Sequence, residues 1–308
     1  MREKNEKRSL ILKRIAIAAA AFIAFNIIAS YAATVIVCSV IFERFDIAYD
    51  LPEEITDARE LMTFERSGRV LQGYYYRSEN SDTLIVIAPG FHAGADGYAH
   101  LAMSLLDSGY SVFSFDPTGC NMSEGDTSGG FPGELLDLAA ALGFIDEKDS
   151  FGNEKVALIG HSMGGYAAAC VSEFGYSASA IITVSGVNSA MEGMIGSSYN
   201  SIGAFAYTNY VNLYLYEAFG YGVKAASVRA DKAVENSGIP TLVIHGSDDP
   251  DYPADRFSIY SHRSDIAAES VSFALVDGGH TDILIDDNGS VVSSTYELIT
   301  DFLERSIE

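Results

Sequence analysis

Six short apolar runs constrain the fold of this 308-residue chain more than any other feature of its sequence. Each run is almost continuous in hydrophobic side chains, and stretches with the composition of helices separate most of them. Such runs are typical of strands that are buried on both faces, as in a parallel sheet. The runs cover residues 83–88, 111–115, 155–159, 180–184, 241–244 and 271–276.

The alternation of strand and helix predicts an α/β fold with a mostly parallel sheet, helices on both faces and ligands at the carboxyl ends of the strands. Two β-prone runs around Ser67-Gly68 predict a hairpin before this sheet. The expected helices cover residues 98–107, 133–147, 163–174, 254–262 and 294–305.

Residues 188–238 interrupt the alternation with about fifty residues rich in Tyr, Ala, Gly and Ser. An insertion of this size at the carboxyl ends of the strands predicts a cap over the site. Its aromatic side chains would either line an apolar pocket or form the core of the cap, and these are Phe205, Tyr207, Tyr210, Tyr214, Tyr216, Phe219 and Tyr221.

The N-terminal region carries a run of 28 residues, 15–42, without a formal charge, after a tail, 1–14, with six basic and two acidic residues. As a helix the run would extend about 42 Å, at about 1.5 Å per residue. It predicts a transmembrane signal-anchor helix with a cytoplasmic tail and an outward-facing domain at 43–308. Cleavage of a signal peptide near Ser30-Tyr31-Ala32, giving a secreted protein, is the alternative. A buried core helix is a third reading. The anchor is favoured because the run continues to Phe42.

Charge and cysteine content exclude other classes of function. With 42 acidic and 19 basic residues the net charge is −23, which opposes binding to nucleic acid. The sequence has no CxxC or HExxH pattern, so no metal site is predicted. Cys120 and Cys170 are expected to be small buried apolar side chains, although a bridge between them stays open.

Gly160-His161-Ser162-Met163-Gly164 follows an apolar strand and precedes an apolar helix. This GxSxG motif in a strand-turn-helix context is typical of a nucleophile elbow, where a tight turn leaves no room for side chains beside the serine. Ser162 is therefore the candidate nucleophile. A serine hydroxyl needs a base to take its proton and an acid to orient that base.

Among the six histidines, His280 is the candidate base because Gly278-Gly279-His280 comes directly after the last predicted strand. The acid should lie in the loop after the preceding strand, where Asp248, Asp249 and Asp251 are all available. The loop after residues 83–88 could place the N–H of Phe91 near that of Met163, and the two would form an oxyanion hole.

These motifs resemble the α/β-hydrolase superfamily, most closely its serine-aminopeptidase-like and monoacylglycerol-lipase-like branch, over residues 61–305. GHSMGG at 160–165 is similar to the family's elbow, and HGSDDPDYP at 245–253 to its HGxxDxxxP loop, which implies that Asp249 is the acid. The order Ser, Asp, His also agrees. Residues 116–125 resemble the family's DxRGxGxSxG turn, with Thr118 and Asn121 replacing Arg and Gly. Pro89 stands where the family usually has His.

The resemblance implies a serine hydrolase that cleaves an ester or amide bond of a small molecule or peptide through an acyl-enzyme, without a cofactor, and the N-terminal helix predicts that it is anchored in a membrane. A peptidase or aminopeptidase, an acyltransferase and a catalytically silent binding protein with the same fold are the alternatives. The side chains that bind the substrate are not predicted from the sequence.

Overall fold

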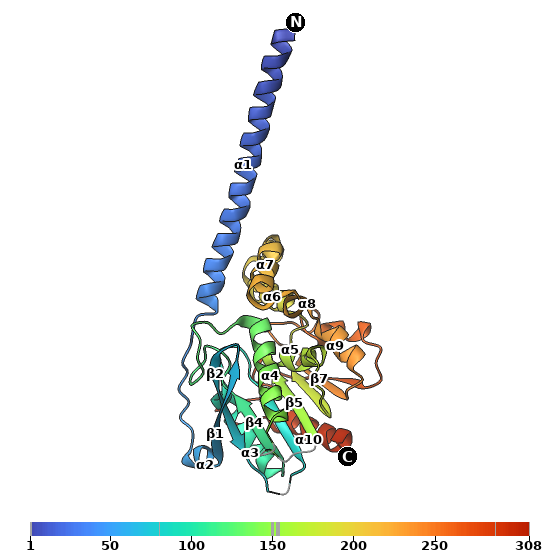
Figure 1. Cartoon of the computed structure of the whole chain (residues 1–308). Coiled ribbons are helices and arrows are strands. Elements are labelled where there is room, and N and C mark those ends of the chain that lie inside the picture. The colour runs from blue at the N-terminus through green and yellow to red at the C-terminus, as the bar shows by residue number, and fades with distance from the viewer. Residues whose placement is uncertain (1, 80, 149–150, 152–154, 287, 308) are drawn as a thin grey trace.

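The computed structural model describes every residue except 1, 80, 149–150, 152–154, 287 and 308, and it describes only the backbone of residues 2–7 (Figure 1). Met1 of the predicted tail is therefore outside the described residues. The described part contains an eight-stranded sheet in the order β1-β2-β4-β3-β5-β6-β7-β8. The strands are β1 Arg59–Arg66, β2 Arg69–Tyr76, β3 Thr83–Ala88, β4 Ser111–Phe115, β5 Lys155–His161, β6 Ala180–Val184, β7 Thr241–Gly246 and β8 Val271–Val276.

Strands β3 to β8 are parallel, and β1 and β2 form the predicted antiparallel hairpin at one edge. Strands β3, β4, β6 and β7 are buried along their whole length, as their continuous apolar runs predict. The α/β class and the mostly parallel sheet predicted from the sequence are confirmed.

Helices cover both faces of this sheet. One apolar core includes side chains of α4 (Gly130–Asp146), α5 (Met163–Cys170) and α9 (Ala230–Ser237). The other core includes side chains of α3 (Ala99–Asp107) and α10 (Ser293–Ile307). The described residues also include α2 (Glu53–Asp57) and the short 3₁₀-helices η1 (Ala95–Tyr98) and η3 (Val171–Phe174).

The helix expected at residues 254–262 is wrong. Turns occupy this segment, and a 3₁₀-helix, η5 (Tyr260–Asp265), follows them. Phe257 adopts a φ of 68°, which a right-handed helix does not allow, and its carbonyl accepts the N–H of Asn188. The segment is therefore tied to the start of the inserted region and does not wind into a helix.

The insertion between β6 and β7 is helical. It contains α6 (Ala190–Ile202), the 3₁₀-helix η4 (Gly203–Asn209), α7 (Tyr210–Tyr221), α8 (Val223–Ser227) and α9. Ser189 accepts the N–H of Glu192 and so caps the first turn of α6. We call residues 190–227 the cap.

The N-terminal helix α1 (Arg2–Ile41) projects from the same end of the domain at which α6 and α7 lie (Figure 1). Among the described residues, 8–41 form one helix that is long and apolar enough to cross a membrane. The ring of Tyr31 meets Phe219 of α7 edge to face, and farther along Cys38 and Phe42 are buried in the domain core.

Candidate active site

Ser162 lies in the turn between β5 and α5 with a φ of 53°, a conformation that side-chain-bearing residues rarely adopt. The flanking glycines make this turn possible. A Cβ on Gly160 would lie 2.1 Å from the carbonyl oxygen of Gly164, and one on Gly164 would lie 2.1 Å from that of Ala88. The spacing of the GxSxG motif therefore has a steric cause, and the turn projects the serine hydroxyl beyond the strand ends.

His280 and Asp249 reach Ser162 from the loops that follow β8 and β7. The Ser162 hydroxyl lies 2.8 Å from His280 Nε2, and His280 Nδ1 lies 2.7 Å from Asp249 Oδ2. The carboxylate cannot donate, so Nδ1–H donates to it and Nε2 is left to accept the serine proton. The structure thus brings together the three side chains predicted from the sequence, in the order that proton transfer requires.

Asp249 is held by more than its bond to the imidazole. Its Oδ1 accepts the backbone N–H groups of Asp251 and Tyr252, both at 2.9 Å. Burial alone would raise the pKa of this carboxyl, but the hydrogen bond and charge of His280 and the N–H of Tyr252 outweigh burial and lower the pKa. Asp249 therefore stays ionised.

Asp249, Asp251 and His280 each place one potential ligand atom within 4.8 Å of the others. Both ring nitrogens of His280 already make hydrogen bonds in the relay. A cation bound by His280 would displace one of these bonds, so this cluster fits proton transfer better than metal binding.

His161 supports the relay in a way that the sequence did not reveal. Its ring is fully buried, and Nε2–H donates to the backbone carbonyl of His280 at 3.0 Å. Its Nδ1 accepts the hydroxyl of Tyr98 at 2.8 Å, and that hydroxyl accepts the N–H of Gly90 at 2.9 Å. Burial lowers the pKa of His161 to about 3, which keeps it neutral. This chain of bonds joins the loop after β3 to the loop that carries His280.

The two candidate oxyanion donors are the backbone N–H groups of Met163 and Phe91. Met163 is the first residue of α5, so its N–H has no acceptor within the helix. Phe91 follows Gly90 at the end of β3 and lines cavities on both sides of Ser162. A backbone N–H pair at this position suits an oxygen that becomes negative.

Ser162 borders two cavities of different character. One, of about 270 Å³, has no charged side chain in its lining and includes Phe131, Met163, Met194 and Leu213. The other, of about 680 Å³, is polar and includes His92, Asn200, Asp251 and Thr281. We call them the apolar cavity and the polar cavity. Together they suit a molecule with an apolar part and a polar part on either side of the bond at Ser162.

The structure decides between the two alternatives for the aromatic side chains of the insertion, since most of them do not line the pocket at Ser162. Of the seven aromatic side chains, only Phe205 lines the apolar cavity. Tyr207, Tyr210 and Tyr214 line a separate cavity of about 580 Å³ near the other end of α6, and Phe219 packs on Tyr31. Another wall of this cavity comes from α1, which contributes Thr34, Val37, Cys38 and Ile41, and from Phe42 directly after it.

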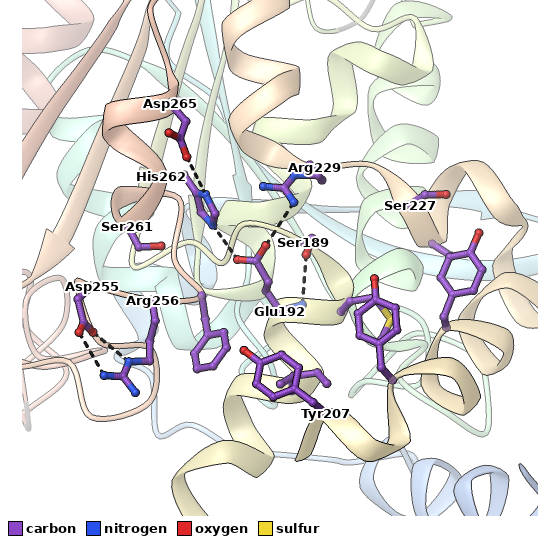
Figure 2. Close-up of a pocket in the computed structure, with 16 residues that line it drawn as sticks. Ser189, Glu192, Tyr207, Ser227, Arg229, Asp255, Arg256, Ser261, His262 and Asp265 are labelled. Atoms are coloured by element: carbon purple, nitrogen blue, oxygen red, sulfur yellow. Dashed lines mark hydrogen bonds and ion pairs between the residues drawn. The ribbon is translucent and has the colours of Figure 1, made fainter. Parts of the chain in front are cut away.

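Figure 2 shows this separate cavity, which we call the distal cavity. Its charged groups are paired with one another. Glu192 lies 3.0 Å from His262 and 3.8 Å from Arg229, and Asp265 lies 3.5 Å from the other ring nitrogen of His262. Because these groups pair with one another, their role is to stabilise the fold. None of these pairs joins a base to a hydroxyl.

The turn at residues 116–125 explains one departure from the family pattern. Asn121, where Gly is usual, adopts a φ of 42°, a region that Asn tolerates better than most side chains. Thr118, where Arg is usual, bonds to Asp137, which pairs with Arg66 at 2.9 Å. Cys120 in this turn and Cys170 are buried free thiols, so no bridge joins them.

Comparisons with known proteins agree with this architecture. A family model described as alpha/beta hydrolase fold matches residues 83–195. The chain therefore has the α/β-hydrolase fold. A search of curated protein sequences found no match.

Three solved structures illustrate the likeness. An esterase from Pyrococcus furiosus is 17% identical with a TM-score of 0.67, and the match covers 87% of this chain and 99% of the esterase. Est1E from Butyrivibrio proteoclasticus, with bound ferulic acid, is 17% identical with a TM-score of 0.61 over 80% and 99% of the two chains. An acylaminoacyl peptidase from Pyrococcus horikoshii is 20% identical with a TM-score of 0.59, over 80% of this chain but 41% of the peptidase.

Proposed function

We propose that this protein is a membrane-anchored serine hydrolase that cleaves carboxylic esters through an acyl-enzyme on Ser162. The observation that carries the proposal is the unbroken hydrogen-bonded path from Ser162 Oγ through His280 to Asp249. The esterases and the peptidase with the same fold support hydrolysis of an ester or amide in general.

In the first step, His280 Nε2 takes the Ser162 proton while Oγ attacks the carbonyl carbon. The carbonyl oxygen becomes negative and accepts the N–H groups of Phe91 and Met163. The imidazolium, stabilised by Asp249, then protonates the leaving alcohol as the bond to it breaks. Water repeats the sequence on the acyl-enzyme and releases the acid.

The lining of the apolar cavity favours an ester over an aminoacyl substrate. A peptidase that removes N-terminal residues must hold an ammonium group, which requires a carboxylate or several carbonyl groups close to the scissile bond. The described residues that line the apolar cavity include no carboxylate, and Asp251 in the polar cavity lies on the side assigned to the leaving group, whereas the ammonium belongs to the acyl side. An acyl chain fits there, and the alcohol would occupy the polar cavity.

Two features support an anchor that stays attached to the domain. The end of α1 is buried in the domain core through Cys38 and Phe42. Upstream of these residues, Ser30 accepts the side-chain N–H of Asn212 at 2.8 Å. By the positive-inside rule, the basic tail would be cytoplasmic and the domain would lie outside.

Labelling of the full-length protein with a fluorophosphonate, together with hydrolysis of p-nitrophenyl acetate, tests the catalytic proposal. Ser162→Ala should abolish both, whereas Ser104→Ala, on α3 and remote from the site, should change neither. Labelling that persists in Ser162→Ala would refute the nucleophile.

The topology is tested separately, in intact cells. Protease added outside should digest the domain, and the N-terminal residue of the membrane-bound protein should lie before Ser30. A soluble product that begins just after Ala32 would show that the helix is a cleaved signal peptide.

A further inference from the structure

The wall that α1 contributes to the apolar cavity links the membrane helix to substrate binding. Thr34 and Cys38, one turn apart on α1, are almost fully buried and line the cavity that ends at Ser162. Across the cavity lie Met194 of α6 and Ala206 of η4. Tethering the domain does not require these contacts, so α1 has a second role as part of the cavity wall.

The length of the uncharged run sets the depth of this wall relative to a bilayer. A helix needs about 20 apolar residues to cross the hydrocarbon core. The count begins at Ile15, because Lys13 and Arg14 precede it, and the twentieth residue is Thr34. The first contacts between α1 and the cap occur at Ser30, Tyr31 and Thr34. The part of the cap that touches α1 therefore meets the membrane boundary.

The surface of the cap matches this position. Phe205 and Phe219 are each 75% exposed, and Ile202, Val211 and Val223 are also largely exposed. Residues 190–221 contain no Lys or Arg, and their two carboxylates are held elsewhere, Glu192 in the distal cavity and Glu217 in the interior. Exposed Phe and Tyr side chains without nearby charge are characteristic of membrane interfaces.

We infer that the exposed apolar face of the cap lies in the lipid leaflet beside α1 and that the apolar cavity opens onto this leaflet, so that the enzyme takes long-chain acyl esters from the membrane that anchors it. This inference rests on the proposed hydrolase function and on the anchor. The acyl chain would enter between α1 and the cap at Val37, which is partly exposed while lining the cavity. Val37 is three residues beyond Thr34, about 4.5 Å along the helix, and so lies at the level of the lipid headgroups. The ester would reach Ser162 with its alcohol in the polar cavity.

The first arm of the test measures depth, and it exploits the absence of tryptophan from the chain. Single reporters are introduced by Phe205→Trp and Phe219→Trp in full-length protein reconstituted in phosphatidylcholine vesicles. Phosphatidylcholine brominated on the acyl chain should quench both strongly. Leu61→Trp, which is 64% exposed on β1 at the sheet edge, should not be quenched. Equal quenching at all three positions, or none at the two cap positions, would overturn the inference.

A fourth reporter separates failure of the inference from failure of the anchor. Ile23→Trp lies in the middle of the uncharged run, and it must be quenched if α1 crosses the bilayer. An unquenched Ile23→Trp refutes the anchor itself. Quenching at Ile23 without quenching at the cap refutes the inference alone, and neither reading depends on catalysis.

The second arm compares acyl chain lengths in the same vesicles. Cys38→Phe should lower the ratio of kcat/KM for p-nitrophenyl laurate to kcat/KM for p-nitrophenyl acetate at least tenfold, since the long chain fills the cavity and the acetyl group does not. Val37→Trp, which is partly exposed and can fold without overpacking, should act in the same direction. Ile36→Phe, on the exposed side of α1, is the matched control and should change neither ester. Equal loss for laurate and acetate, or no loss in either cavity variant, would overturn the inference.

Retained fluorophosphonate labelling of Cys38→Phe and Val37→Trp shows that Ser162 is still reactive in these variants.

Discussion

The apolar cavity and the distal cavity both use cap residues of α6, yet they differ in what their polar groups do. The distal cavity is the larger, and its carboxylates, His262 and Arg229 neutralise one another. The apolar cavity has no charge of its own but ends at Ser162, whose hydroxyl is bonded to an imidazole with an ionised carboxylate behind it. The comparison shows that the reactive site is identified by a hydroxyl bonded to a base that can take its proton, and not by the volume of the cavity.

The largest expected effect contrasts the carboxylates of the two regions. Asp249→Asn should lower kcat about a thousandfold to ten-thousandfold, because an amide N–H cannot accept from His280 Nδ1 and the imidazole loses its orientation and its counter-charge. Asp265→Asn alters the carboxylate beside His262 and should leave kcat within twofold. Steady-state hydrolysis of p-nitrophenyl acetate measures both, and a similar kcat for the two variants would show that the regions do not differ as described.

The next effect concerns stability and compares two glutamates. Glu217 of α7 is buried, and neither of its carboxylate oxygens has a hydrogen-bond partner among the described residues. Burial raises its pKa to about 8. The unfolded chain loses this proton near the ordinary value of 4.5, so folding stability is fully present below that pH and declines as pH rises toward 8. Glu217→Gln should raise the free energy of unfolding by about 1–3 kcal/mol at pH 8 and by nothing at pH 4.

Glu192→Gln is the matched comparison, because its carboxylate is bonded to His262 and to Asn188. This substitution should destabilise the protein at neutral pH, by about 0.5–1 kcal/mol. Thermal unfolding of the full-length variants in detergent, repeated at each pH, measures both. The same sign for both substitutions would contradict the contrast between an unpaired and a paired glutamate.

A smaller effect on rate tests the support of the relay by Tyr98 and His161. Tyr98→Phe removes the hydroxyl that bonds to His161 and to the N–H of Gly90. We expect kcat for the acetate ester to fall about tenfold with KM unchanged, since the bonds to His161 and to the N–H of Gly90 already occupy this hydroxyl and it acts through His280. Tyr210→Phe in the distal cavity should have no effect on kcat.

The conservative variant of His161 distinguishes positioning from simple structural support. His161→Gln keeps an N–H that can donate to the His280 carbonyl, so it should retain more of kcat than His161→Phe at equal thermal stability. Equal kcat in the two variants would mean that the hydrogen bond does not position His280.

Much of this architecture follows from local sequence pattern. The continuous apolar runs predict buried parallel strands, which is confirmed for β3, β4, β6 and β7. Burial on both faces is wrong for β8, because this strand lies at the edge of the sheet and most of its residues are at least partly exposed. Ser162, His280 and the acidic loop each come directly after such a strand, and the carboxyl ends of parallel strands share one edge. Their convergence is therefore predictable from order alone, whereas the choice among three aspartates required the family pattern.

The wall of the apolar cavity was not predictable in the same way. Seven aromatic residues of the insertion look alike in the sequence, and their assignment to different cavities depends on how α6, η4 and α7 turn in space. The contribution of α1 depends on contacts across about 175 residues, such as the one between Thr34 and Asn209. The helix expected at 254–262 fails for a related reason, since the bond from Asn188 to Phe257 outweighs local helix propensity.

The smallest effect tests the pairing within the distal cavity. The hydrogen bond from His262 to Glu192 outweighs burial and raises the pKa of His262. The pair therefore stabilises the fold fully below the ordinary histidine pKa, and this contribution disappears as pH rises through the raised value. Because water reaches the site, His262→Gln should cost less than about 1 kcal/mol at pH 5.5 and nothing at pH 9. Hydrolysis of p-nitrophenyl acetate should stay unchanged at both pH values. A loss of kcat in His262→Gln would show that the distal cavity communicates with Ser162, and the two regions would then have to be treated as one site.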